Sequence, residues 1–206
     1  MRWPPPNELE LSGNTVVLRP ASAERDAADL FAALDDDRVW THLAGRPADA
    51  QGWATVLAGR APQLWCTWIV RLRAPAFGLP GGAVVGTTSY LEVSAEDARL
   101  EIGSTAYCPE VWATRVNPEC KLLLLGYAFD ELGAGRVQLK TDIRNVRSAQ
   151  AIARLGAQFE GTLRRYQRRA DSTVRDTVLF SVVAAEWPDV RAGLLERLRG
   201  GDARTS

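Results

Sequence analysis

The sequence predicts an α/β (α+β) fold with a central mixed, mostly antiparallel sheet of about seven strands flanked by helices. Three observations support this prediction. Alternating apolar and polar residues at 65–72, 83–91 and 98–104, separated by turn residues, indicate an antiparallel meander. From residue 118 the pattern changes to helix, strand and helix. Two further alternating segments near the C-terminus predict a hairpin.

The N-terminal part is predicted to contain an extended leader, a short strand and two helices. The leader covers residues 1–14, and a strand at residues 15–19 ends at Pro20. Ser22 is a suitable N-cap for a helix that runs to about residue 35, with apolar residues on one face. A second helix is expected at residues 47–58.

The C-terminal part is predicted to alternate between helices and strands. The helix at residues 118–132 is apolar on nearly every side, so we expect it to be buried against the sheet. Glycines follow this helix and the next one, where they are typical C-caps. The remaining expected elements are strands at 136–143, 160–169 and 175–183, helices at 146–155 and 186–199, a polar turn at 171–173, and a loose tail at 200–206.

Composition predicts one ordinary globular domain over residues 1–206. The chain is 46% hydrophobic and 24% charged, and its formal net charge is zero, which does not favour nucleic acid or an anionic membrane as a partner. No signal peptide or membrane-spanning segment is recognisable, so we expect a cytoplasmic protein. Three cysteines without metal or redox spacing and a single histidine, His42, argue against metal sites and histidine-based triads.

A loop that joins a strand to a buried helix is a candidate anion site. Residues 112–117 connect the strand at 98–104 to the helix that starts at Pro118. The start of a helix carries unpaired N–H groups and the positive end of the helix dipole, which favour phosphate. The candidate ligands are the backbone groups of Ala113, Thr114, Arg115, Val116 and Asn117, with the Arg115 guanidinium as an added charge. Asn117 followed by Pro118 is also a favourable helix start that needs no ligand.

Several segments in order resemble the GNAT superfamily of N-acetyltransferases. The segments are Leu100-Glu101-Ile102-Gly103, the loop at 112–117, residues 127–133, residues 141–148, Leu155-Gly156-Ala157 and Glu160-Gly161. More narrowly, they are similar to the RimJ/RimL-like branch that acetylates ribosomal-protein N-termini. The similarity covers about residues 10–187.

The resemblance implies acetyl-CoA as cosubstrate and direct acetyl transfer to an amine. It also implies a sheet that splays between its fourth and fifth strands, with acetyl-CoA in the split and its pyrophosphate on the loop before the long helix. In the family this loop reads Gln/Arg-x-x-Gly-x-Gly/Ala. Here Trp112 takes the first position, and Arg115 and Asn117 replace the two glycines that would let phosphate approach the backbone closely.

Asn145 and Ser148 match the family motif Asn-x-x-Ser at the start of a helix. The resemblance implies that Asn145 hydrogen-bonds the pantetheine or acetyl region and that Ser148 donates a proton to the departing CoA thiolate. A purely structural interpretation is also available, because Asn145 is a preferred N-cap and Ser148 lies in the first turn.

Glu101 is the candidate general base. It alternates with Leu100 and Ile102 on a strand, so its carboxylate points to the opposite face. If helices cover both faces, burial raises its pKa, which suits a base that deprotonates an ammonium group. A solvated structural carboxylate is the alternative. Asp142 is a weaker candidate, and we expect it to hold the following turn.

Arginines and tryptophans give weaker signals. Arg144 and Arg147 flank the Asn-x-x-Ser turn and are candidates for the 3′-phosphate of CoA, although surface arginines are common. The basic run at 164–169 is expected on an exposed strand, where it offers a docking site for an acidic protein. Tryptophans such as Trp40 and Trp53 are more often core residues than ligand contacts. The resemblance places the acceptor site at the first two helices, so some of these tryptophans are also candidates to line it.

Together these features predict an acetyl-CoA-dependent N-acetyltransferase that uses a ternary complex. The acceptor is a primary amine, either a protein N-terminus or a small molecule, and the sequence does not choose between them. The alternatives are a noncatalytic acyl-CoA-binding or regulatory domain, marked by the altered loop, and an interaction domain without cofactor. A homodimer is among the expected assemblies, although the sequence marks no interface.

Overall fold

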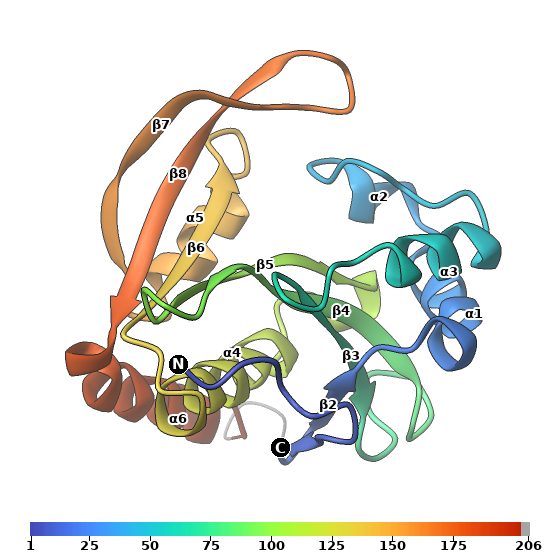
Figure 1. The fold of residues 1–206 in the computed structure, drawn as a ribbon. Coiled ribbons are helices and arrows are strands. Elements are labelled where there is room, and N and C mark those ends of the chain that lie inside the picture. The colour runs from blue at the N-terminus through green and yellow to red at the C-terminus, as the bar shows by residue number, and fades with distance from the viewer. Residues whose placement is uncertain (203–206) are drawn as a thin grey trace.

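The computed structural model describes residues 1–202 and contains one eight-stranded sheet with the order β1-β2-β3-β4-β5-β6-β8-β7 (Figure 1). The strands are β1 (Leu11–Ser12), β2 (Val16–Pro20), β3 (Cys66–Leu72), β4 (Val84–Ser94), β5 (Arg99–Tyr107), β6 (Arg136–Asp142), β7 (Gln158–Arg168) and β8 (Val174–Val183). The α-helices are α1 (Ala23–Leu34), α2 (Asp37–Trp40), α3 (Ala50–Ala58), α4 (Val116–Gly126), α5 (Val146–Ala153) and α6 (Trp187–Asp202).

The sheet is mixed and mostly antiparallel, as predicted. Every neighbouring pair of strands is antiparallel except β5 and β6, which are parallel. A parallel pair needs a crossover connection, and α4 provides it. The expected number of about seven strands is one too low, because the predicted leader contributes the two-residue edge strand β1.

Helices cover both faces of the sheet. Helices α1 and α3 lie together on one face, where a core cluster includes Leu30, Trp53 and Ile69. Helices α4, α5 and α6 cover the other face, where the larger core cluster includes Leu124, Leu139 and Ile152 (Figure 1). Helix α4 packs against α6 as well as against the sheet, and most of its residues are buried, which confirms that it is an interior helix.

The start of α4 corrects one prediction. The helix begins at Val116 rather than Pro118, and the N-cap position belongs to Arg115, which makes no side-chain capping bond. Asn117 therefore lies inside the first turn and is not the N-cap. Thr114 supplies the missing cap, since its hydroxyl accepts a hydrogen bond from the Val116 N–H at 3.3 Å. The helix continues past Gly126 as a π-helical segment, Tyr127–Glu131.

Other element boundaries differ by a few residues. The helix expected at 47–58 begins at Ala50, because Asp49 caps it by accepting from the Gly52 N–H at 2.7 Å. Ser22 occupies the N-cap position of α1, but its side chain makes no capping bond. Helix α6 extends to Asp202, past the expected end at residue 199, so the tail expected at 200–206 is helical at its start. The rest of that tail lies outside the described residues.

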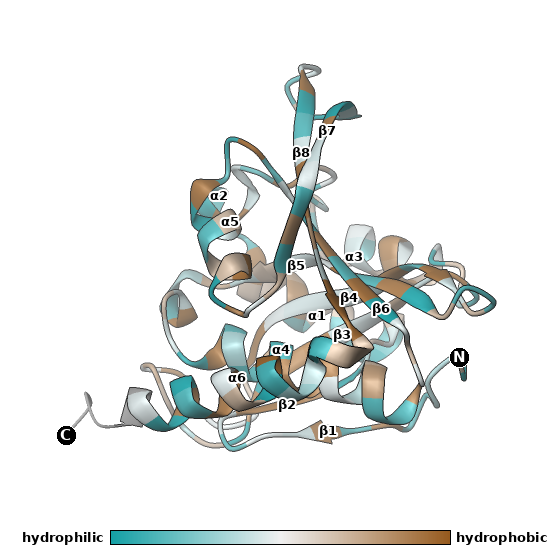
Figure 2. Cartoon of the chain, turned by 90° about the vertical axis from the view of Figure 1, so that its left-hand side faces the viewer, coloured by the Kyte–Doolittle hydropathy of each residue, from teal (hydrophilic) through white to brown (hydrophobic). Residues whose placement is uncertain are grey.

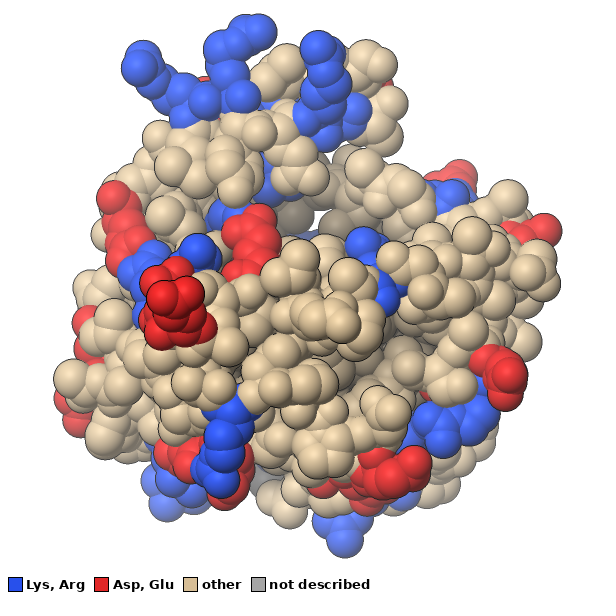
Figure 3. Space-filling model, viewed as in Figure 1, with Lys and Arg blue, Asp and Glu red and all other residues tan. Residues whose placement is uncertain are grey.

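Strands β7 and β8 form a long hairpin that projects from the body of the molecule (Figures 1 and 2). Its turn is closed by the Arg169 N–H, which donates to the Thr173 carbonyl at 2.8 Å. The basic run at 164–169 lies on this hairpin, where Lys and Arg side chains gather at the top of Figure 3. The prediction that this run forms an exposed strand is confirmed.

Candidate active site

Strands β5 and β6 separate soon after they begin. Their parallel pairing covers residues 99–101 of β5 and 136–138 of β6, whereas β5 continues to Tyr107 and β6 to Asp142. Because β1 is an additional edge strand, β5 and β6 are the fourth and fifth of the predicted strands. The splay that the resemblance implies between these two strands is therefore present. Figure 3 shows a hollow in the molecular surface between the β7–β8 hairpin and the region of α2.

Glu101 lies at the point where the two strands separate. Its side chain is 6% exposed, and its Oε2 atom is 2.8 Å from the Lys140 ammonium and accepts a 3.3 Å hydrogen bond from Gln138. Its Oε1 atom accepts no hydrogen bond from any residue that the structure describes. Burial raises the pKa of Glu101 despite the adjacent ammonium. One oxygen is thus held and the other is available to a ligand.

Gly103 makes room for the unpaired oxygen of Glu101. A Cβ atom on Gly103 would lie 2.6 Å from Oε1, which is closer than such atoms approach. The Glu101 carboxylate therefore lies over the backbone of β5, two residues along the strand. The sequence contains the signal, since Gly103 follows Glu101 at the spacing of one strand face.

Lys140 connects the two sides of the splay. Its ammonium donates to Glu92 at 2.7 Å and to the Tyr166 hydroxyl at 2.9 Å, in addition to the contact with Glu101. Burial opposes the charge, but these hydrogen bonds outweigh it and raise the pKa of Lys140. Sequence reasoning missed Lys140 and Gln138, although both lie on the polar face of the alternating strand β6. It also left Tyr166 without a place.

The candidate phosphate loop keeps the helix start but uses other residues than expected. Ala113 has a left-handed conformation with φ +59°, which an ordinary residue adopts only at some cost. The Thr114 hydroxyl donates to the Val111 carbonyl at 2.7 Å and so holds the turn. The Arg115 guanidinium donates to the Leu198 carbonyl of α6 at 2.6 Å, so in this structure it is directed to α6.

Trp112 joins this loop to the start of α5. Its indole N–H donates to the Tyr107 carbonyl at 2.8 Å. The Arg147 guanidinium lies over the ring at 4.2 Å, and that of Arg38 lies over it at 5.9 Å. Arg147 therefore contacts the candidate phosphate loop at residues 112–117. Among the described residues, the exposed Arg144 makes no contact with the ring of Trp112.

Asn145 is the N-cap of α5. Its Oδ1 atom accepts from the Ser148 N–H at 3.0 Å, which leaves its amide NH₂ group for a ligand. The Ser148 hydroxyl has no hydrogen-bond partner within residues 1–202, and no hydrogen bond joins Ser148 to Glu101. The structure thus brings Asn145 and Ser148 together, and no hydrogen bond among the described residues joins either of them to Glu101.

Asp142 serves the turn before α5, as expected. It accepts from the Arg144 N–H at 3.0 Å and from the Arg169 guanidinium at 2.6 and 2.9 Å. The hydrogen bonds from Arg169 lower the pKa of Asp142 to about 2, which makes it a poor base.

The cysteines and the histidine offer no alternative chemistry. Burial raises the pKa of Cys66, Cys108 and Cys120 to about 12, so none is a ready thiolate nucleophile. Within the described residues, no group of potential metal ligands is assembled. None of the helices in this part of the chain has the length and apolar character to cross a membrane.

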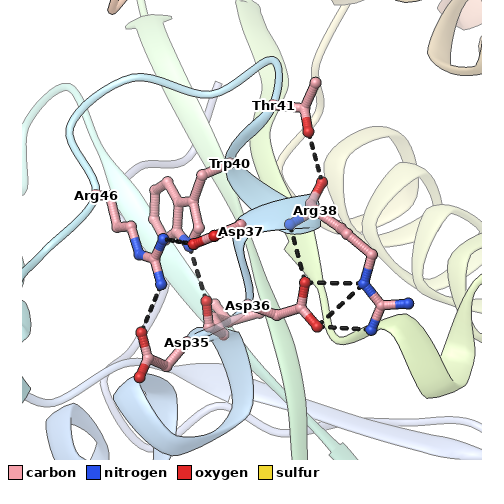
Figure 4. A network of polar contacts seen from close by, with 8 residues as sticks. Asp35, Asp36, Asp37, Arg38, Trp40, Thr41 and Arg46 are labelled. Atoms are coloured by element: carbon pink, nitrogen blue, oxygen red, sulfur yellow. Dashed lines mark hydrogen bonds and ion pairs between the residues drawn. The ribbon is translucent and has the colours of Figure 1, made fainter.

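A second hollow lies on the α1–α3 face, beside the β5 end of the splay. It is lined by the loop after α2, by α3 and by β3 to β5, and includes Trp40 and Trp53. The segment around α2 is held by charged contacts, since Arg46 bridges Asp35 at 2.6 Å and Asp37 at 2.5 Å (Figure 4). The Trp40 indole donates to the Leu34 carbonyl at 2.7 Å, which fixes its ring. The expectation that tryptophans of the first helices line a site fits this hollow.

Comparison with known proteins identifies the family. Residues 15–158, more than half of the chain, match the family model described as the acetyltransferase (GNAT) domain. The protein therefore belongs to the GNAT acetyltransferase family.

Individual relatives agree with this assignment. Uncharacterized N-acetyltransferase p20 of Bacillus licheniformis is 29% identical over 104 residues, which cover 50% of this chain and 57% of p20. The chain therefore spans little more than half the length of the curated relatives that it matches. A solved structure from T. thermophilus, described as a candidate acetyltransferase, is 35% identical with a TM-score of 0.79 and covers 96% of this chain and 100% of that one.

The fold is also that of RimJ. The structure of Mycobacterium smegmatis RimJ in complex with CoA-disulfide has a TM-score of 0.74 and 20% identity, with 88% of each chain covered. At 20% identity, the similarity to RimJ shows a shared fold only.

Proposed function

We propose that this protein transfers the acetyl group of acetyl-CoA to a primary amine by direct attack in a ternary complex. The observation that carries the proposal is the Glu101 carboxylate at the point where β5 and β6 separate, with Oε2 held by Lys140 and Oε1 unpaired among the described residues. We further propose a single acyltransferase domain in the cytoplasm that acts on a protein N-terminus or a small-molecule amine.

The residues around the splay suit acetyl-CoA as the cosubstrate. The start of α4 offers N–H groups and a positive dipole to a pyrophosphate, and residues 113–117 would hold it. The left-handed Ala113 turns the backbone just before the positions where the family has glycine, which supports an anion-binding role. Arg147 and the Asn145 amide would contact other parts of the cosubstrate. Because Arg115 is bound to Leu198, we propose its backbone rather than its side chain as a ligand.

The chemical step needs one base and one acid. Glu101 Oε1 would take a proton from the attacking ammonium group, and its raised pKa makes it a stronger base than a solvated carboxylate. The nitrogen then forms a bond to the acetyl carbon as the carbon–sulfur bond breaks. The Ser148 hydroxyl would protonate the departing thiolate, and the second proton that the nitrogen loses on becoming an amide would restore that hydroxyl. Most of the acceleration would come from alignment of amine and thioester.

Thiol release from acetyl-CoA in the presence of a panel of amines and peptides tests the proposal. We expect release with at least one amine, a lower kcat with an unchanged acetyl-CoA affinity in Ser148→Ala, and loss of the acidic limb of the pH–rate profile in Glu101→Gln. An unshifted profile in Glu101→Gln would argue against the base, and an unchanged kcat in Ser148→Ala would remove Ser148 from the mechanism.

The glycine-free loop also favours a second candidate, a noncatalytic acyl-CoA-binding domain. Calorimetry with acetyl-CoA separates both candidates from a domain that has lost the cosubstrate. Binding without thiol release for any amine would select the noncatalytic domain.

A further inference from the structure

A lysine without an acidic partner is buried between α4 and the sheet. Lys121 lies in the second turn of α4, and its ammonium donates to the hydroxyls of Thr88 at 3.3 Å and Thr105 at 3.2 Å. No carboxylate within residues 1–202 pairs with it. Burial lowers the pKa of Lys121 to about 8, because the charged form loses its hydration. A charge that is kept in the interior at such a cost is a candidate for a functional role.

The two threonines share one hydrogen bond, and burial decides its direction. Their hydroxyl oxygens are 2.7 Å apart, and the geometry allows either of them to donate. Both oxygens already accept from Lys121. If Thr105 donated, the hydroxyl hydrogen of the fully buried Thr88 would have no acceptor among the described residues, which is costly. Thr88 is therefore the donor, and the hydroxyl hydrogen of Thr105 is left for a ligand.

Thr105 belongs to a β-bulge on the unpaired part of β5. The register of β4 and β5 shifts between Thr87 and Ser89, so that Ser104 and Thr105 together face Thr88. Beyond residue 101, β5 is no longer paired with β6. Strand β4 covers one edge of Thr105, and α4 covers the face that carries its hydroxyl. The part-exposed Thr105 therefore opens toward the splay.

Thr105 and Glu101 lie on opposite faces of β5. Leu100 and Ile102 belong to the core cluster on the α4 face, so Glu101, which alternates with them, points to the other face. Helix α5, which carries Ser148, covers the same face as α4. The Thr105 hydroxyl is thus on the side of the proposed acid, and the proposed base is on the opposite side.

The separation of Thr105 from Glu101 suits a single carbonyl group. Oε1 of Glu101 lies over Gly103, at 2.6 Å from the position of a Cβ there. Thr105 follows Gly103 by two residues, which is about 7 Å of strand. A hydrogen bond of about 2.8 Å at each end, with a nitrogen, a carbon and an oxygen atom between them, covers this distance. An amine nitrogen on Glu101 and a carbonyl oxygen on Thr105 therefore fit one reacting pair.

On the basis of the proposed function, we propose that the Thr105 hydroxyl donates to the carbonyl oxygen of the acyl thioester and that Lys121 is a positioning residue that acts through Thr105. Attack by the amine moves negative charge onto this oxygen, and the charge returns to the carbon–oxygen bond as the carbon–sulfur bond breaks. Thr105 keeps its proton throughout. A donor that is already fixed and polarised by a cation stabilises the developing charge, because it does not have to reorganise during the reaction.

Thr105→Val should lower kcat for thiol release about 100-fold, the effect of removing one donor to a developing oxyanion. Thr105→Ser keeps the hydroxyl and should restore most of the rate. The matched control is Thr87→Val, because the buried Thr87 hydroxyl donates to the Trp68 carbonyl at 2.9 Å and not to the Lys121 cluster. This control should keep kcat close to the wild-type value. An unchanged kcat in Thr105→Val would overturn the proposal and leave acetyl transfer intact.

Lys121→Met separates a positioning role from a structural one. Replacement of an unpaired buried charge by an apolar side chain is often neutral or stabilising, so urea denaturation should show no loss in the free energy of unfolding. We expect kcat to fall about tenfold, the difference between a charge-assisted and a neutral hydrogen bond. Added to Thr105→Val, Lys121→Met should cause little further loss. A lower stability with an unchanged kcat, or losses of kcat that multiply in the double variant, would reject action through Thr105.

Calorimetry tests the contact without turnover. S-ethyl-CoA is a thioether that lacks the carbonyl oxygen. The wild type should bind acetyl-CoA about two- to tenfold more tightly than S-ethyl-CoA, the range of one hydrogen bond, and Thr105→Val should bind both equally. This result together with no thiol release from any amine would reject the acetyl-transfer function and retain the Thr105 contact. Equal binding of both compounds by the wild type, or a preference for acetyl-CoA that persists in Thr105→Val, would reject the contact.

Discussion

At the scale of single residues, the two oxygens of Glu101 have different surroundings. Oε2 is held by Lys140, whereas Oε1 lies over Gly103 and is unpaired among the described residues. The position of Oε1 depends on the missing side chain of Gly103, which makes this glycine a positioning residue.

Gly103→Ala should therefore lower kcat. The new methyl group would overlap Oε1 and push the carboxylate away, and a misplacement of about 1 Å costs up to about 100-fold in rate. We expect a roughly 10- to 100-fold lower kcat with unchanged acetyl-CoA affinity, measured by thiol release and calorimetry. Gly193→Ala is the control, since nothing lies within 4 Å of that position. Equal kcat values for both variants would contradict the assignment.

Lys140→Gln should move the acidic limb of the pH–rate profile to higher pH. Glu101 accepts a proton only when it is ionised, so activity rises as pH rises through its pKa. The Lys140 ammonium favours the ionised form, and its removal leaves burial to raise the pKa of Glu101 further. Arg164→Gln, on the exposed hairpin, is the control variant. A limb that stays in place or moves to lower pH would disprove the coupling.

At the scale of elements, α4 also holds the N-terminal leader. Glu119, in the first half of α4, is buried, and its carboxylate accepts from the N–H groups of Asn14 and Thr15. Gly13 permits this contact, because a Cβ there would meet the carboxylate. The leader, which sequence reasoning treated as merely extended, is thus fastened to the crossover helix.

Glu119→Ala should destabilise the fold. It removes the part-buried hydrogen bonds from two N–H groups to a charged acceptor, at a cost of about 1–3 kcal/mol in the free energy of unfolding. Urea denaturation measures this loss, and Glu96→Ala, at an exposed position in the β4–β5 turn, is the control. A loss no larger than that of the control would show that the leader is not held by Glu119.

At the scale of the whole molecule, acid should weaken the fold in part through Asp142. Hydrogen bonds from Arg169 lower the pKa of Asp142 from 3.8 to about 2. Because the pKa of Asp142 is lower in the folded protein than in the unfolded chain, its ionisation stabilises the folded state at pH values above the unfolded pKa. This stabilisation is lost as pH falls through the folded pKa. The contribution is about 2 kcal/mol at neutral pH and fades between about pH 4 and pH 2.

Asp142→Asn measures that contribution. The free energy of unfolding of the variant should lie below that of the wild type at pH 6, and the difference should shrink at pH 3, as followed by urea denaturation. Glu96→Gln, an exposed carboxylate, is the control. A difference that is the same at both pH values would exclude a contribution from the ionisation of Asp142.

Much of this architecture is predictable from the sequence, because alternation and capping act over short distances. The meander, the buried helix and the Asn145 cap follow from local patterns. The predicted start of α4 is wrong because the Asn117–Pro118 pair looks like a cap, while the actual cap is the hydroxyl of Thr114. The contact of Lys140 with Glu101 depends on strand order, which residue spacing does not specify.

The short pairing of β5 with β6 has a consequence for the interior of the sheet. Beyond residues 101 and 138, each strand has a neighbour on one side only, so the middle of the sheet contains two facing edges. An unpaired edge is a template for any extended chain that carries amide groups. An extended ligand with amide groups, such as a linear diamide, would therefore be able to hydrogen-bond to both edges and so connect the two halves of the sheet.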